Sequence, residues 1–274
     1  LRTDGNNRMP LRLDPSFRAQ LADSDRPFVG MWVCSGSPLL AEVAAGSGLD
    51  WLLIDMEHSA NTLDSVLVQL QAVAAYPIAP LVRVPSNDTV AIKQVLDLGA
   101  QNLIVSMVSS ADEARAAVSA TRYPPEGVRG VGSALARSAR WNRVDRYLQE
   151  SAQHVSLTVQ IETAAGVEAA ADIAAVDGVD AVFVGPSDLS ASMGLLGQQT
   201  HPDVTAAVER VFAAVKAAGK AVGVNAFDPA TADAYLAAGA DFVAVGADVA
   251  LLARASEALA ARFTSADGGS RASY

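Results

Sequence analysis

The stretch Trp51-Leu52-Leu53-Ile54-Asp55-Met56-Glu57-His58 places an apolar, strand-forming run directly before two acids and a histidine. The same arrangement recurs at Val155–Ile161, which precedes Glu162, and at Ala181–Val184, which precedes Gly185-Pro186-Ser187-Asp188. Polar residues at the ends of buried strands are typical of the catalytic face of an α/β barrel. The sequence therefore predicts one site built from segments that lie far apart in the chain.

Eight such apolar runs alternate with helical segments. The runs are Phe28–Val33, Trp51–Ile54, Pro80–Arg83, Asn102–Val105, Val155–Ile161, Ala181–Val184, Ala221–Val224 and Phe242–Val245. They lack the alternation of half-exposed strands, which indicates a parallel sheet covered on both faces. The count of eight favours a (β/α)8 TIM barrel. The alternative is an open doubly wound sheet, but the segment after the first run, Cys34-Ser35-Gly36-Ser37-Pro38, matches a phosphate-binding glycine loop poorly.

Helical patterns fill the intervals between the strands. We expect helices at Pro15–Leu21, Thr62–Ala75, Val90–Leu98, Ser110–Thr121, Ala164–Ile173, Val204–Ala218 and Ala230–Ala238. The pattern divides the chain into an N-terminal extension (1–25), a barrel domain (26–262) and a flexible C-terminal tail (263–274). About fifty residues separate the fourth and fifth strands, and loops of this length in compact domains are usually functional.

Composition excludes several classes of protein. The formal net charge of −10 argues against a nucleic-acid binder, which would carry a basic patch. No apolar run has the length needed to cross a bilayer, and the first 25 residues are polar. The single cysteine, Cys34, can form neither an internal disulfide nor, alone, a zinc site. We expect a cytoplasmic enzyme whose partners are small molecules.

Glu162 and Asp188 follow consecutive strands and should be neighbours. Two carboxylates without a histidine or cysteine cluster suit a hard divalent ion, Mg²⁺ or Mn²⁺. The structural alternatives are that Glu162 is favoured by the dipole at a helix N-terminus and that Asp188 caps a helix.

His58 and Arg83 are the other candidates at the strand ends. The remaining histidines, His154 and His201, lie away from this face, whereas Asp55 could orient the His58 ring for acid–base work. Arg83 could bind a carboxylate or a developing oxyanion, or else form a purely structural ion pair.

Lysine chemistry is not favoured. The three lysines, Lys93, Lys216 and Lys220, all lie away from the carboxyl ends of the strands, which argues against a Schiff base. No glycine-rich phosphate cradle follows the last two strands, so the substrate is not expected to be held through a phosphate.

Five ordered motifs within residues 28–258 resemble the HpcH/HpaI aldolase family of metal-dependent class II pyruvate aldolases. They are Asp55–His58, Tyr123–Gly130, Gln160–Thr163, Gly185–Ser190 and Phe242–Gly246. The run Gly130–Arg137, continued by Trp141-Asn142-Arg143, is most similar to the branch that cleaves 4-hydroxy-2-oxoheptanedioate. Branches acting on 2-keto-3-deoxy sugar acids are also similar.

The resemblance implies roles for individual residues. Glu162 and Asp188 would hold Mg²⁺, Mn²⁺ or Co²⁺, with no organic cofactor. His58 would act with Asp55 through a water on the metal, and Arg83 would stabilise the enolate. The residues implied to line the site are Trp32, Gln160, Gly185, Pro186 and Ser187, with Asp97 as a residue that supports the lining residues from behind or lies at an interface.

The resemblance also implies an assembly and a reaction. The fold would be a barrel of the phosphoenolpyruvate/pyruvate-domain type with its last helix swapped between subunits, forming a hexamer as a trimer of dimers. The expected reaction is reversible cleavage of a 4-hydroxy-2-oxo acid to pyruvate and an aldehyde such as succinic semialdehyde. The alternatives are oxaloacetate decarboxylation through the same enolate and a non-catalytic binding barrel. As a further hypothesis, Arg137 or Arg140 in the long loop would bind a distal carboxylate.

Overall fold

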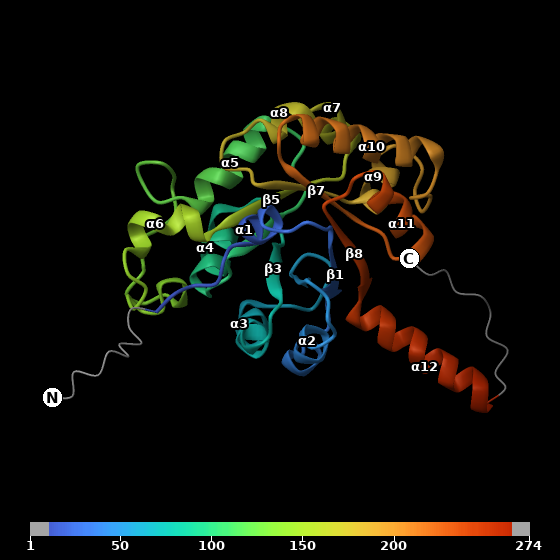
Figure 1. Ribbon diagram of the computed structural model, residues 1–274, viewed down its shortest axis with the longest axis horizontal. Helices are drawn as coiled ribbons and strands as arrows, with labels where there is room; N and C mark the ends of the chain where they lie inside the picture. The colour runs from blue at the N-terminus through green and yellow to red at the C-terminus, as the bar shows by residue number, and fades with distance from the viewer. Residues whose placement is uncertain (1–10, 265–274) are drawn as a thin grey trace.

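The computed structural model describes residues 11–264, in which eight parallel strands close into a barrel (Figure 1). The strands are β1 (Phe28–Val33), β2 (Trp51–Asp55), β3 (Ala79–Val84), β4 (Asn102–Val105), β5 (Ser156–Ile161), β6 (Ala181–Val184), β7 (Ala221–Asn225) and β8 (Phe242–Ala247). Each strand pairs with the next, and β8 closes on β1 through pairs such as Phe28 with Phe242. The predicted TIM barrel is confirmed, and the open doubly wound sheet is wrong.

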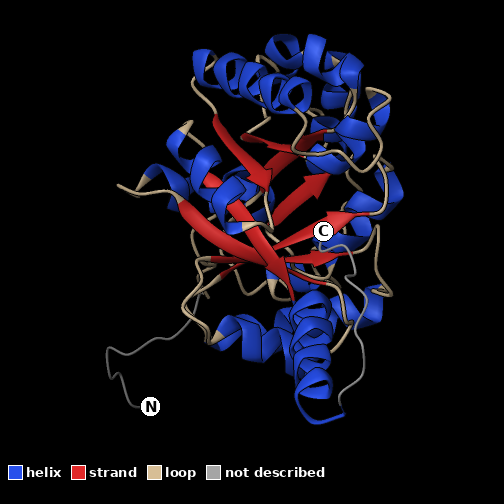
Figure 2. Cartoon of the chain, turned by 90° about the vertical axis from the view of Figure 1, so that its right-hand side faces the viewer, coloured by secondary structure: helices blue, strands red, loops and turns tan. Residues whose placement is uncertain are grey.

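Helices surround the strands on the outside (Figure 2). They are α2 (Pro38–Ala45), α3 (Leu63–Ala72), α4 (Thr89–Asp97), α5 (Ala111–Thr121), α6 (Tyr147–His154), α7 (Ala164–Glu168), α8 (Ala170–Ala174), α9 (Pro186–Ser192), α10 (Pro202–Ala217) and α11 (Pro229–Ala237), with short 3-10 turns at Val73–Ala75 and Arg137–Ala139.

One predicted helix, Ala164–Ile173, is two short helices that meet at Ala169. The first of them contains Gly166, a poor helix former. A Cβ at Gly166 would lie 3.2 Å from the carbonyl oxygen of Val108, so the glycine permits close packing of α7 on the neighbouring loop.

Alternate residues of each strand point into the barrel. The interior cluster contains Trp51, Leu53, Leu81, Ile104 and Phe183, whereas the intervening residues pack outward against the helices. Continuing each inward series to the carboxyl end of its strand gives polar residues, namely Asp55 on β2, Arg83 on β3 and Gln160 on β5. The barrel is therefore filled by apolar layers below one polar layer at its mouth.

Helix α1 (Phe17–Ala22), within the predicted N-terminal extension, closes the opposite end of the barrel. Phe17 is fully buried, and its backbone amide donates a hydrogen bond of 2.7 Å to Oδ1 of Asn102. Its ring packs edge-on against Phe242 at a centroid distance of 5.2 Å. This part of the extension therefore belongs to the core of the barrel.

The last helix, α12 (Asp248–Thr264), projects away from the body of the molecule (Figure 1). Asp248 is its only buried residue. The predicted tail falls outside the described residues except for Phe263 and Thr264, which end α12. Within residues 11–264, none of the helices is both long and apolar enough to span a membrane.

Candidate active site

Asp55, Arg83 and Glu57 form a charged cluster at the mouth of the barrel, in which Asp55 and Arg83 are buried and Glu57 is half-buried. Oδ1 of Asp55 accepts a hydrogen bond of 2.8 Å from Nε of Arg83, and Nη1 of Arg83 lies 2.9 Å from Oε2 of Glu57. The guanidinium carbon lies 4.3 Å from the centre of the Trp32 ring. Burial lowers the pKa of Arg83, but Asp55 and Glu57 more than reverse that effect, so the pKa is raised. The ion pair proposed as the structural alternative is present, and it holds a permanent cation at the mouth.

Glu162 lies in a cradle of hydrogen-bond donors. Its Oε1 accepts from the backbone amide of Met107 at 2.8 Å, and its Oε2 accepts from Nε2 of Gln160 at 2.6 Å. Gly185 completes the cradle because a Cβ there would lie only 2.7 Å from Oε2 of Glu162. Glu162 is 2% exposed and precedes Thr163, the N-cap of α7. The interpretation of Glu162 as a residue favoured by a helix N-terminus is therefore wrong.

Asp188 lies in the first turn of α9, and its charge acts on Glu162. The N-cap of that helix is Gly185, so the alternative interpretation of Asp188 as the N-cap is also wrong. Burial first, and then the charges of Glu57 and Asp188, raise the pKa of Glu162 to about 7, although the Met107 amide lowers it. The negative charges of Glu57 and Asp188 near Glu162 are therefore only partly offset by the positive charge of Arg83.

The side-chain oxygen atoms available at this mouth suit the coordination of a hard divalent cation. Glu162 and Asp188 supply carboxylate oxygens, and Oε1 of Gln160 is buried without a hydrogen-bond partner in the described part of the chain. Residues 11–264 contain no group of three or more His, Cys, Asp or Glu side chains arranged for a metal. Water and substrate would therefore complete the coordination, as is common for Mg²⁺.

His58 is exposed at the mouth, in the loop that follows β2. Asp55 accepts hydrogen bonds from the backbone amides of Glu57, at 3.0 Å, and of His58, at 3.2 Å, in addition to the bond from Nε of Arg83. These bonds hold the backbone of the loop. Orientation of the imidazole ring by Asp55 stays a prediction.

The other predicted lining residues also belong to this end of the barrel. Nε1 of Trp32 donates a hydrogen bond of 2.7 Å to Oδ1 of Asn225, which ties β1 to the end of β7. Pro186 and Ser187 form the first turn of α9, beside Asp188. The structure therefore brings together residues from β1, β2, β3, β5 and β6.

Asp97 is placed differently. It is the last residue of α4, and the loop after Arg83 leads to the opposite end of that helix. Its Oδ1 lies 3.4 Å from Nη2 of the buried Arg129. Within one chain Asp97 therefore supports the long loop, and its contribution to an interface stays a prediction.

The part of the long loop that contains Arg137 and Arg140 lies away from the mouth. Nη1 of Arg137 donates to the carbonyl of Leu98 at 3.0 Å, and Nη1 of Arg140 donates to the carbonyl of Arg137 at 2.6 Å. Both arginines therefore lie at the carboxyl end of α4, away from His58. The hypothesis that either binds a distal substrate carboxylate is wrong for a single chain, because side-chain-to-backbone bonds hold them elsewhere.

Sequence reasoning missed the end of β4. Ser106 and Met107 follow this strand, and Met107 has a left-handed backbone, with φ of 57°. This conformation directs its amide to Glu162. The available signal was the inward series, because Ser106 follows the interior residue Ile104 by two positions.

The fold and the site define a barrel enzyme whose mouth is suited to metal-assisted chemistry. Residues 29–255 match the model of the HpcH/HpaI aldolase/citrate lyase family, and the chain belongs to this family. The predicted family and the predicted class, the carbon–carbon lyases, are confirmed. Dependence on a metal ion is typical of this family.

Several relatives are similar over most of their length. The chain is 53% identical over 251 residues to the 4-hydroxy-2-oxo-heptane-1,7-dioate aldolase of Shigella sonnei. The matched region covers 92% of this chain and 95% of the relative. The chain is 56% identical over 238 residues to the protein of the same name from Salmonella arizonae, with coverages of 87% and 90%. A solved family structure from Burkholderia cenocepacia J2315 has 43% identity and a TM-score of 0.86, and the match covers 90% of this chain and 98% of that chain.

Proposed function

We propose that this protein cleaves 4-hydroxy-2-oxoheptanedioate reversibly to pyruvate and succinic semialdehyde. The substrate is the one named for relatives that are more than half identical to this chain. The observation that carries the proposal is the cradle of Glu162 beside the Arg83 cluster. This arrangement supports the proposal because a buried carboxylate suited to a metal ion and a fixed cation lie at one mouth, where an oxo acid can contact both.

Glu162 and Asp188 would hold the divalent ion, which we propose is Mg²⁺, Mn²⁺ or Co²⁺. When bound, such an ion polarises the 2-oxo group. Arg83 would donate to the oxygen that gains negative charge as the bond between C3 and C4 breaks. Asp55 and Glu57 hold the guanidinium in place for this task, and Trp32 covers one of its faces.

His58 would accept the proton of the 4-hydroxyl group during cleavage. An exposed imidazole in a loop fixed by Asp55 is accessible to a substrate that enters from solvent. The same group would return a proton to the pyruvate enolate, so that the reaction is complete without an organic cofactor.

The proposal is tested by pyruvate release from racemic 4-hydroxy-2-oxoheptanedioate, coupled to lactate dehydrogenase, on chelator-treated protein. We expect release only when Mg²⁺, Mn²⁺ or Co²⁺ is added back, and the order of the rates identifies the preferred ion. Metal-dependent release from 2-keto-3-deoxy sugar acids alone would reassign the substrate. Consumption of oxaloacetate without aldol cleavage would refute the proposed reaction.

We also propose that α12 is exchanged between two copies of this chain. The helix presents exposed apolar side chains at Leu251, Leu252, Leu259 and Phe263. Helix α2, next to the first strand, exposes Leu39 and Val43, each to 66%. In a closed barrel the last helix ordinarily covers this region, so a partner's α12 would bury both apolar surfaces.

Light scattering tests the assembly. A trimer of such dimers would have about six times the chain mass of 28.2 kDa. Replacing Leu251 and Leu252 with serine should release smaller species, and a monomer at all concentrations of the unmodified protein would contradict the exchange. A cytoplasmic location stays a prediction, which cell fractionation would test.

A further inference from the structure

Ser106 lies at the mouth of the barrel but has no role in the site described above. It continues the inward series of β4 after Ile104. In register, Ile104 pairs with Arg83 on one side and Thr158 on the other. Ser106 therefore lies in the layer just above Arg83, between the strands that supply Arg83 and Glu162.

The hydroxyl group of Ser106 is buried and unpaired. Ser106 is 1% exposed, and its Oγ has no hydrogen-bond partner among the described residues. Buried polar atoms in folded proteins are nearly always paired, and one left unpaired destabilises the fold. At the mouth of the barrel, a bound ligand can supply the missing partner of such a hydroxyl. Because no base contacts this hydroxyl, it is not an activated nucleophile.

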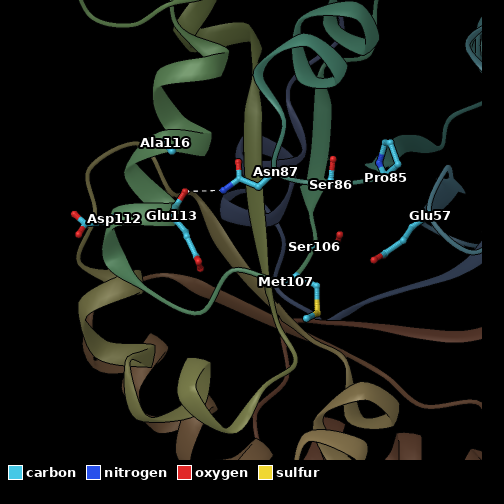
Figure 3. Close-up of a pocket in the computed structure, with 9 residues that line it drawn as sticks. All are labelled: Glu57, Pro85, Ser86, Asn87, Ser106, Met107, Asp112, Glu113 and Ala116. Atoms are coloured by element: carbon cyan, nitrogen blue, oxygen red, sulfur yellow. Dashed lines mark hydrogen bonds between the residues drawn. The ribbon is translucent and has the colours of Figure 1, made fainter.

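Ser106 lines a cavity of about 510 Å³. Figure 3 shows Ser106 with Glu57 on one side, Met107 below it, and the first turn of α5, with Asp112 and Glu113, on the other side. Asn87 borders the same space and donates to the backbone carbonyl of Glu113 at 2.9 Å.

Neither Glu162 nor Asp188 lines this cavity. The cavity lies next to Glu162 through Met107, which lines it and whose backbone amide donates to Oε1 of Glu162. A ligand held at those carboxylates by its oxo-acid end can extend into this cavity, which Ser106 lines.

We propose that Ser106 is a substrate-contacting residue whose hydroxyl binds the oxygen on C4 of the 4-hydroxy-2-oxo acid. This inference rests on the proposed function. The C4 oxygen is shared by every substrate of this class, and it becomes the carbonyl oxygen of the aldehyde product. Ser106 then distinguishes the whole substrate from pyruvate, which lacks C4.

The test compares two reactions of the metal-loaded protein and of the Ser106→Ala variant. Cleavage of 4-hydroxy-2-oxoheptanedioate involves the C4 oxygen, whereas exchange of the methyl protons of pyruvate in D₂O, followed by NMR, does not. We expect Ser106→Ala to lower kcat/KM for cleavage about tenfold, which corresponds to the loss of one hydrogen bond, and to leave the exchange rate unchanged.

Thermal unfolding of the metal-free protein provides a further readout. Ser106→Ala removes an unpaired buried hydroxyl, so Tm should stay constant or rise, whereas loss of a structural hydroxyl would lower it. The matched control is Ser138→Ala, because Ser138 is also buried with an unpaired Oγ but lies in the long loop. This control should change neither reaction.

Equal losses of cleavage and exchange would overturn the assignment to the C4 oxygen, as would unchanged cleavage in Ser106→Ala. An unmodified protein that exchanges pyruvate protons but cleaves no 4-hydroxy-2-oxo acid would refute the proposed function and, with it, this inference. Unchanged exchange together with impaired cleavage supports both.

Discussion

The backbone amide of Met107 donates a hydrogen bond of 2.8 Å to Oε1 of Glu162. It does so because Met107 adopts a left-handed conformation, with φ of 57°, at the end of β4. Such a conformation in a residue other than glycine costs about 1 kcal/mol, and strain of this kind concentrates at functional sites. The bond leaves the carboxylate of Glu162 aligned with the mouth before any ion arrives.

Met107 therefore offers a test of this alignment through its backbone. Glycine adopts the left-handed conformation freely, whereas valine resists it strongly. We expect Met107→Gly to bind Mn²⁺ nearly as well as the unmodified protein and Met107→Val to bind it about tenfold more weakly, as for other groups that orient metal ligands. Titration followed by electron paramagnetic resonance measures the affinity. Equal affinities in the two variants would contradict the positioning role.

The raised pKa of Glu162 predicts how the stability of the metal-free protein depends on pH. A carboxyl group with a pKa of about 7 in the fold and an ordinary pKa of 4.5 binds its proton more tightly when folded. The contribution of Glu162 to the free energy of unfolding should therefore be greatest below pH 4.5. It should fall as pH rises to 7, by about 3 kcal/mol in total.

The Glu162→Gln variant isolates this contribution. At pH 8 the metal-free variant should unfold at a higher temperature than the unmodified protein, and the difference should shrink toward pH 5. Added Mn²⁺ should raise Tm only for the unmodified protein, because the amide cannot replace the carboxylate. Identical pH profiles for the two metal-free proteins would show that the carboxyl group has an ordinary pKa.

The sequence predicted most of the site because four segments share one visible pattern, a buried strand followed by polar residues. Asp55, Arg83, Glu162 and Asp188 all follow this rule, and the parallel sheet necessarily brings their strand ends together. The strand bounds depend on the same contrast between apolar and polar residues, which explains why β1 begins and ends where the sequence predicts.

The end of β4 did not show this pattern. Val105-Ser106-Met107-Val108 contains no ionisable group, so only the position of Ser106, two residues after the inward Ile104, could have indicated its contribution. The hydrogen bond from Met107 depends on its backbone dihedral angle, which residue identity does not reveal. The hypothesis that Arg137 or Arg140 in the long loop binds a distal carboxylate was wrong for a different reason. Arg137 is positioned by a bond to the carbonyl of Leu98, and a backbone acceptor carries no signature in the identity of the residue.

Arg83 should be required for the chemical step because of its geometry as well as its charge. Its Nε and Nη1 face two different carboxylates, an arrangement that a lysine ammonium cannot reproduce. We expect Arg83→Lys to lower kcat on the order of a hundredfold, which is typical for the loss of an oxyanion donor. Steady-state kinetics with the lactate dehydrogenase coupling gives the value.

The matched control is Arg26→Lys. Arg26 forms a similar two-pronged pair with Asp50 at the opposite end of the barrel, so its replacement should leave kcat unchanged. If Arg83→Lys retained full turnover, Arg83 would be a structural ion pair only.

His58 should affect proton transfer more than binding. It is exposed at the mouth, and Asp55 contacts its backbone amide, so His58→Ala removes the imidazole while leaving the anchored loop intact. We expect kcat for cleavage to fall by roughly a hundredfold or more, as is typical for loss of a general acid–base group. The inhibition constant of pyruvate as a product should change far less.

His154→Ala is the control, since His154 ends α6 just before β5, at the far end of the barrel. If the His58→Ala variant kept an unchanged kcat, another group at the mouth would have to accept the proton.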